Sequence, residues 1–331
     1  MGLNAGSAIT TGYKNTFIGK DAGAQTVAGI NSVCIGYNAG SGVMDADAAG
    51  TIAIGYSAGA GITSGQRNIA IGFEALDVQD DGDQNIAIGY QALTEMDSGE
   101  NRNIAIGYLA GDSIDNAGAD DNVLIGDQAG RGGTGAMANC VAIGSSAMTS
   151  TVSNAQTGTV AVGYYALNAL TSGAGNTAVG YSSLRKITTG GYNTCLGYNT
   201  LGDTDGANGV TGRYNVHVGY NSGGGNHGNG LHQYNTVVGA ESMTGVCDSA
   251  QYNTIMGYAA GQAITSGDYN VAIGVQAGIA ITTGRNNAIL GSDSGRSSTT
   301  ASGSVFIGQD AGRTNTTGNN NIAIGNAALN G

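Results

Sequence analysis

One nine-residue stretch recurs with few changes along this chain of 331 residues. NIAIGYQAL at 85–93 is followed by NIAIGYLAG at 103–111, and near copies occupy 68–76 and 321–329. Internal repeats of this kind are typical of solenoids, because each repeat can bury its apolar residues only by stacking on its neighbours. Alignment on the glycine after the aliphatic triplet gives 18 copies, at Gly19, Gly36, Gly55, Gly72, Gly89, Gly107, Gly126, Gly144, Gly163, Gly180, Gly197, Gly219, Gly239, Gly257, Gly274, Gly291, Gly308 and Gly325.

Each repeat predicts a short strand and a turn. The triplet is β-branched and ends at glycine, and segments such as 62–65 (ITSG) and 281–284 (ITTG) predict a second extended piece. A coil this short cannot also hold a helix. The 306 residues from 19 to 325, divided by 17 intervals, give a mean period of 18. We therefore expect an all-β fold, a parallel β-solenoid (β-roll) of about 18 coils that forms an oligomeric fibre. Residues 1–331 are predicted to be one continuous domain, with longer, irregular coils at about 198–239.

Composition excludes several other classes of protein. The chain has 61 glycines but no proline, and 40% of its residues are hydrophobic, which excludes collagen and argues against disorder. The net charge of −12 would repel a phosphate backbone, so we expect no nucleic-acid partner. No apolar run is long enough to insert into a membrane. The cysteines lack the spacing of a disulfide or zinc framework and are predicted to be small buried hydrophobes: Cys34, Cys140, Cys195 and Cys247.

The triplet is apolar at all three positions. The residue before the glycine (for example Ile54) and the residue two positions earlier (Ile52) share one strand face, which we predict points into the coil. The residue between them should then face outward, yet it is also apolar, and a strand that is apolar on both faces is covered on both. The sequence thus predicts an assembly face against another subunit, formed by Phe17, Cys34, Ala53, Ala70, Ala87, Ala105, Leu124, Val237, Ile255 and Phe306. A surface stripe of alanine without a partner is the alternative.

Two further sets of residues recur beside the strands. Asparagine opens most of them (Asn68, Asn85), and stacked coils would let these amides hydrogen-bond along the axis. An aromatic residue follows the glycine in ten copies (Tyr90), and a second tyrosine set precedes the asparagine (Tyr214). We expect the rings to stack on one another, with sugar binding as the alternative.

These residues, read as N-x-h-A-I-G-x-x-A, resemble the head repeats of trimeric autotransporter adhesins. They are also similar to the repeat arrays of bacteriophage tail fibres and related surface fibres. The resemblance implies a parallel β-roll, often wound by three chains, that serves as a shaft or adhesive head of an extracellular surface appendage or a virion. We expect the partner to be the chain itself, in lateral contact, which the resemblance implies is often trimeric, or end-to-end.

Acidic residues gather between 74 and 121. Stacked coils would bring several carboxylates into one patch, formed by Asp80, Asp81, Asp83, Asp97, Asp120 and Asp121. A solvated acidic face is the default expectation, without a cofactor. Calcium, which prefers carboxylate oxygens, is the alternative.

The irregular coils hold all three histidines of the chain. Long loops on a rigid scaffold often carry function, so we consider a ligand loop formed by His227, His232 and Tyr234 that would contact a glycan or receptor. A metal site would require His227 and His232 to converge with a third ligand. A loop without function is the remaining alternative.

No arrangement of nucleophile, base and acid stands out, so we expect no enzymatic activity. GYSAG at 55–59 matches a nucleophile elbow by letters, but it lies in a predicted solenoid turn rather than between a strand and a helix. The sequence favours a structural fibre or filament. An adhesin that recognises cell-surface glycans is the alternative, and an ice-binding solenoid, which would need a flat and regular threonine array, is less favoured.

Overall fold

The computed structural model describes residues 2–78, 81–96, 99–114, 118–132, 137–150, 156–202, 212–225, 232–247 and 249–330. They form two compact units, Met1–Tyr164 (unit 1) and Tyr165–Gly331 (unit 2). Within the described ranges all regular structure is strand, bridge or turn, and no residue is helical. The predicted all-β parallel solenoid is thereby confirmed, whereas the division into units leaves the prediction of one continuous domain untested.

Unit 1 contains one strand per coil, each three residues long, and one additional pair of two-residue strands. The long series is β1 (Thr16–Ile18), β2 (Val33–Ile35), β3 (Ile52–Ile54), β4 (Ile69–Ile71), β5 (Ile86–Ile88), β6 (Ile104–Ile106), β7 (Val123–Ile125), β9 (Val141–Ile143) and β11 (Val160–Val162). The additional pair is β8 (Met137–Ala138) and β10 (Gln156–Thr157).

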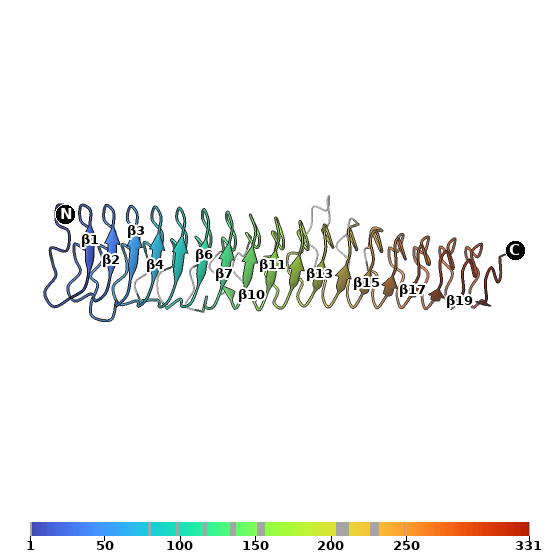
Figure 1. Cartoon of the computed structure of the whole chain (residues 1–331). Helices are drawn as coiled ribbons and strands as arrows, with labels where there is room; N and C mark the ends of the chain where they lie inside the picture. The colour runs from blue at the N-terminus through green and yellow to red at the C-terminus, as the bar shows by residue number, and fades with distance from the viewer. Residues whose placement is uncertain are drawn as a thin grey trace. The chain divides into compact units, whose positions relative to one another are not determined.

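Unit 2 repeats the same arrangement without an additional pair in its described part. Its strands are β12 (Thr177–Val179), β13 (Thr194–Leu196), β14 (Val216–Val218), β15 (Thr236–Val238), β16 (Thr254–Met256), β17 (Val271–Ile273), β18 (Ala288–Leu290), β19 (Val305–Ile307) and β20 (Ile322–Ile324). Successive strands within each unit lie side by side and point the same way (Figure 1).

Within each unit, every three-residue strand pairs with the equivalent strand of the next coil, in parallel and without a shift in register. Ile69, Ala70 and Ile71 of β4, for example, lie opposite Ile86, Ala87 and Ile88 of β5. Equivalent residues of successive coils therefore form ladders, in which the same kind of side chain recurs about every 4.8 Å along the stack of coils.

The inward face of the strand is the opposite of the one predicted. The middle residue of the triplet points into the coil, and the two residues that flank it point outward and are half-buried or exposed. The predicted assembly face is therefore wrong, because nine of its residues are fully buried within their own coils and Phe17 is half-buried: Phe17, Cys34, Ala53, Ala70, Ala87, Ala105, Leu124, Val237, Ile255 and Phe306.

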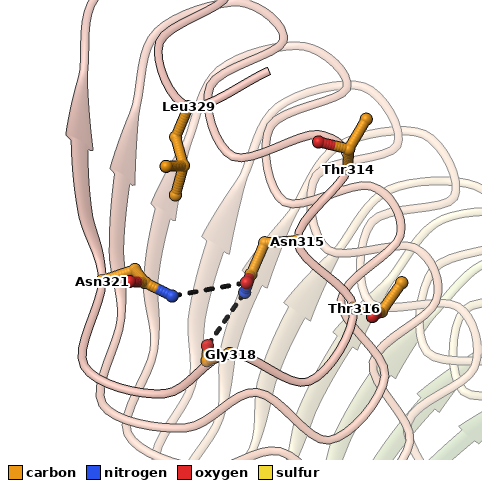
Figure 2. A pocket seen from close by; sticks show the side chains of 6 residues that line it. All are labelled: Thr314, Asn315, Thr316, Gly318, Asn321 and Leu329. Atoms are coloured by element: carbon orange, nitrogen blue, oxygen red, sulfur yellow. Dashed lines mark hydrogen bonds between the residues drawn. The ribbon is translucent and has the colours of Figure 1, made fainter. Parts of the chain in front are cut away.

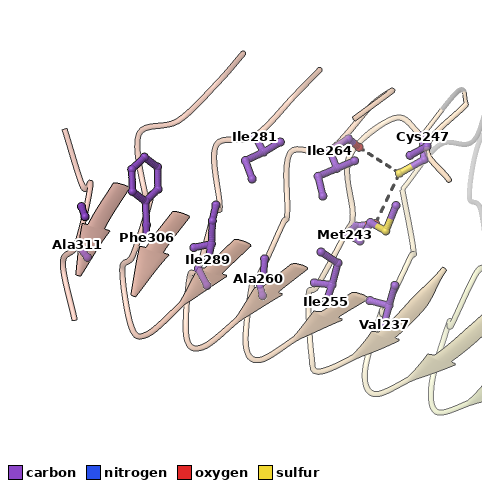
Figure 3. Close-up of a cluster of buried hydrophobic side chains, with 14 residues drawn as sticks. Val237, Met243, Cys247, Ile255, Ala260, Ile264, Ile281, Ile289, Phe306 and Ala311 are labelled. Atoms are coloured by element: carbon purple, nitrogen blue, oxygen red, sulfur yellow. Dashed lines mark hydrogen bonds between the residues drawn. The ribbon is translucent and has the colours of Figure 1, made fainter. Parts of the chain in front are cut away.

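Size explains which residues point inward. Each coil is narrow, and its interior also receives an alanine three positions after the glycine, such as Ala92, and a larger residue four positions further on, such as Met96. Two bulky residues per strand would overfill this space, whereas one alanine or one occasional larger residue packs without voids. Figure 3 shows this core in unit 2, where Ile255 and Ile289 from strands meet Ile264 and Ile281 from the opposite wall.

The glycine after each strand forms a ladder of its own. Gly89 has a φ of +143°, and a Cβ placed on it would collide with the carbonyl group of Gly107 in the next coil. The same collision recurs at most steps, for example from Gly72 onto Gly89. Both the backbone conformation and the close approach of the two coils require glycine at this position.

This ladder predicts a strong effect of one methyl group. We expect Gly89→Ala to lower the free energy of unfolding by about 3 kcal/mol or more, since the new Cβ meets the backbone rather than a movable side chain. Urea denaturation followed by circular dichroism measures the change. The control is Gly158→Ala, where φ is +62° and a Cβ would meet nothing within 4 Å, so a loss of only about 1 kcal/mol is expected. Equal losses in the two variants would contradict the packing role.

Candidate functional site

The outer face of the strands exposes two rows of mostly apolar side chains. Its two rows are the first and third residues of each triplet, such as Ile104 and Ile106 in β6 or Thr254 and Met256 in β16. Ile106 is 37% exposed and Met256 is 47% exposed, which is high for side chains in the middle of a sheet. Large apolar surfaces of this kind mark contact sites in soluble proteins.

Aromatic ladders flank these rows, as the sequence predicted. In unit 1 the rings of Tyr37, Tyr56, Phe73, Tyr90 and Tyr108 stack with centroids 4.9–5.2 Å apart. In unit 2 two ladders run beside the strands, one through Tyr181, Tyr198 and Tyr220 and the other through Tyr192, Tyr214, Tyr234, Tyr252 and Tyr269. The rings within each ladder are within 16° of parallel, so stacking is confirmed.

Stacking limits what the ladders can bind. A ring such as Tyr234 has a neighbouring ring on each face, at 5.1 Å and 5.0 Å, and therefore presents its edge and its hydroxyl group to solvent. A sugar that packs on an aromatic ring needs an open face. The ladders thus offer an apolar, hydroxyl-tipped edge for contact rather than a row of stacking platforms.

A buried asparagine ladder holds successive coils together. The Oδ1 atom of Asn103 accepts the backbone N–H of Asn122 (3.1 Å), and its Nδ2 atom donates to the carbonyl of Ala119 (2.7 Å). The backbone N–H of Asn103 in turn donates to Oδ1 of Asn85 (2.9 Å). The prediction of amides bonded along the axis is confirmed, in unit 1 by Asn68, Asn85, Asn103 and Asn122 and in unit 2 by Asn176, Asn193, Asn215, Asn235, Asn253, Asn270 and Asn287.

The acidic residues of the predicted patch also serve the coil contacts. Asp81 accepts the backbone N–H of Gly99 (2.7 Å), Asp83 that of Gln66 (2.8 Å) and Asp120 that of Asn101 (2.7 Å). Each of these three carboxylates therefore bonds one coil to a neighbouring coil. Asp80 and Asp97 lie outside the described residues.

Asp121 forms the closer of the two ion pairs of Arg102, the other being with Asp120 at 3.6 Å. Its carboxylate receives two hydrogen bonds from Arg102, at 2.6 and 2.9 Å. The Arg102 guanidinium lowers the pKa of Asp121. Because this pair is exposed, it adds little to stability.

Two of the three residues of the predicted ligand loop lie in the described part of the chain, and both have structural contacts. His232 is buried in the coil, where its Nε2 atom lies 3.1 Å from Nε2 of His217, and the hydroxyl of Ser222 lies 3.4 Å from Nδ1 of His217. Tyr234 belongs to the aromatic ladder, and His227 lies outside the described residues. The histidine pair is therefore a polar part of the core. One signal for it is visible in the sequence, since His217 occupies a middle strand position.

Two pockets of the described residues are small and lack reactive groups. Figure 2 shows one of about 350 Å³ in the coil of β20, where Nδ2 of Asn321 donates to Asn315 (3.3 Å) and Nδ2 of Asn315 donates to Gly318 (2.9 Å). The second, of about 200 Å³, is lined mainly by glycine and small residues with Tyr192 and Arg213.

Other functional groups are placed as structural elements. All four cysteines are buried and unpaired as disulfides, as predicted, and burial raises the pKa of the Cys34 thiol to about 12, which leaves it unreactive near neutral pH. Across the described ranges no three His, Cys, Asp or Glu side chains are placed to hold a metal ion together. The same ranges include no helix that could cross a membrane.

No protein-family model matches the sequence, and a search of curated proteins finds no significant match. The function must therefore be inferred from the repeat and from the surface that it creates.

One carboxyl in unit 1 is poorly accommodated. The Oδ1 atom of Asp77 is buried, and within the described residues it has no hydrogen-bond partner. Burial, followed by repulsion from Glu74, raises the pKa of Asp77 from 3.8 to about 6. The folded chain thus prefers the protonated form of this carboxyl.

The asparagine ladder predicts a large loss when its amide is removed. We expect Asn103→Leu to lower the free energy of unfolding by about 2–4 kcal/mol, because the backbone N–H of Asn122 and the carbonyl of Ala119 lose their partner while buried. Thermal and urea denaturation measure the change. Gln66→Ala removes an amide bonded only to the exposed Arg67 and should shift stability by about 0.5 kcal/mol or less. A similar effect of both variants would contradict the ladder's role.

Asp77 predicts a pH dependence with a definite sign. Because its pKa is higher in the folded chain, the folded state binds more protons between pH 3.8 and about 6, and stability falls as the pH rises through this window. We expect Asp77→Asn to remove this fall, so that the stability gained over the wild type is larger at pH 7 than at pH 4. Melting temperatures at the two pH values give the comparison, and the exposed Asp47→Asn serves as the control. A gain that is larger at pH 4 would contradict the assignment.

Proposed function

We propose that this chain is a non-enzymatic structural protein that builds a fibre or filament, of the phage tail-fibre or extracellular surface-filament kind. Its place would be a virion or an extracellular surface appendage, and its main partner would be another copy of itself. The observation that carries the proposal is the pair of outward apolar rows that every three-residue strand of the coil series repeats.

The regular ladders support a mechanical role. Within each unit the strand pairing bonds successive coils in register, and along much of each unit asparagine amides and stacked rings add further contacts between coils. Such repetition resists bending and local unfolding because a deformation at one coil must break several kinds of contact at once. A binding protein or an enzyme would require one distinctive site instead of many equivalent ones.

The outward rows support assembly. Isolated exposed apolar side chains are ordinary, but long rows of them are typical of surfaces that another subunit covers. The third strand position is apolar throughout the coil series, and the first is apolar except for threonine in β1, β12, β13, β15 and β16. A strand that is apolar on both faces still calls for a neighbouring subunit on its outer face. That outer face is formed by the first and third residues of the triplet instead of the middle one. Similarity of the repeat to adhesin heads and phage fibres points in the same direction.

The adhesin alternative has weaker support. Its aromatic residues would have to offer open ring faces to sugars, and in the ladders these faces are covered by neighbouring rings. An ice-binding surface would need threonine in both outward rows, whereas the third strand position is aliphatic, or methionine in β16, throughout the coil series. The fibre therefore agrees best with the geometry.

Self-association is expected, and it should respond to salt in a specific way. Copies that each carry a charge of −12 repel one another, whereas apolar contact does not weaken with ionic strength. Raising the salt concentration to about 1 M shortens the screening length to about 3 Å and should increase the assembled fraction in sedimentation velocity. Electron microscopy of the same samples should show multi-chain fibres. A chain that stays monomeric at every salt concentration would overturn the proposal.

A further inference from the structure

The outward positions of five consecutive coils in unit 2 carry no charge. Four positions per coil are involved: the residue before the asparagine, the two outer strand residues, and the residue after the glycine. We call this set the unit 2 face, and it consists of Tyr192, Thr194, Leu196, Tyr198, Tyr214, Val216, Val218, Tyr220, Tyr234, Thr236, Val238, Ala240, Tyr252, Thr254, Met256, Tyr258, Tyr269, Val271, Ile273 and Val275. All of them are half-buried or exposed.

The aromatic edges make this face wider than the strand rows alone. The ladder from Tyr192 to Tyr269 borders one side of the strands, and Tyr198, Tyr220 and Tyr258 border the other. Tyr258 is 54% exposed. Tyrosine supplies a large contact area with little loss of side-chain freedom, and it is enriched at protein interfaces.

The equivalent positions of unit 1 are interrupted by charge. Arg67 and Arg102 stand before the asparagines, Asp121 does so in the next coil, and Asp127 follows the glycine of that coil. Arg102 and Asp121 are bonded to each other along the stack. Neither unit carries charge in the strand rows, which are aliphatic between the unit 1 charges and include Thr194, Thr236 and Thr254 in the unit 2 face. The difference in charge between the units therefore lies in what borders the strands.

Resting on the proposed fibre function, we infer that lateral assembly is made by the unit 2 face, which packs against a second copy of this chain. An uncharged face is where two chains of net charge −12 can approach with the least repulsion. Charged residues near it, such as Arg213, Glu241 and Asp268, lie outside the four rows and would form the polar rim.

The spacing of the rows also favours a second copy over other partners. The unit 2 face repeats its four side chains at each coil, about every 4.8 Å. A second chain presents rows with the same repeat, so that each contact made at one coil can be made again at the next. A partner without this repeat would match the face at one coil and lose the match at its neighbours.

A matched pair of variants tests the inference. Met256→Lys and Ile106→Lys place the same charge at the same strand position, the first in the unit 2 face and the second in unit 1. Both side chains point outward, so both variants should fold, which circular dichroism and melting temperature would verify. Burying an unpaired ammonium in an interface is strongly unfavourable. We expect Met256→Lys to weaken self-association at least about tenfold, and Ile106→Lys to leave it within about twofold of the wild type.

The outcomes separate this inference from the proposed function. If the wild type assembles and only Met256→Lys dissociates it, the inference stands. If the wild type assembles and the two variants weaken assembly equally, or only Ile106→Lys weakens it, the assignment of the interface to the unit 2 face is wrong while the proposed fibre function remains. A wild type that never assembles removes the fibre and the inference together. Tyr220→Lys and Tyr108→Lys form a second matched pair, and an equal effect of these two would likewise overturn the role of the aromatic border.

Discussion

The hydrogen bond from a buried asparagine side chain to the backbone of the next coil is the interaction on which the rest of each unit depends. The amide of Asn103 supplies an acceptor and a donor to groups that would otherwise be buried without partners. It also fixes the start of the strand, because its position inside the coil determines which of the following residues point inward. The outward rows and the aromatic borders are consequences of that choice.

The same asparagine explains why the fold was predictable and its inward face was not. The repeat, its period and the alternation of strand side chains led directly to a parallel solenoid with stacked rings. Hydrophobicity alone then suggested that Ile86 and Ile88 fill the coil around Ala87. Asn85 and Ala87 are two residues apart, however, and must lie on the same side of the strand. A buried amide ladder therefore implied a buried alanine, and the narrow coil has no room for the larger residues.

The individual polar sites were less accessible to sequence reasoning. A cluster of carboxylates indicates charge but does not say that Asp83 and Asp120 each accept a backbone N–H from an adjacent coil. That role depends on a turn geometry that no short motif marks. The contact of His217 with His232 joins a strand to the turn before the next strand, and the unequal length of the coils between 197 and 239 conceals their register. The unit 2 face, by contrast, can be read from the sequence once it is known that the middle residue of each triplet points into the coil.

The glycine ladder also separates the parts of the repeat that can change from those that cannot. The segment of each coil from the asparagine position to the glycine keeps a constant length, because its backbone touches the same segment of the next coil directly. The remainder of the coil varies, so that the steps from Gly197 to Gly219 and on to Gly239 span 22 and 20 residues instead of 17. Gene segments that encode whole coils could thus be gained or lost without altering the contacts that this segment makes. For a protein of this design, length is a heritable variable that is largely independent of the fold.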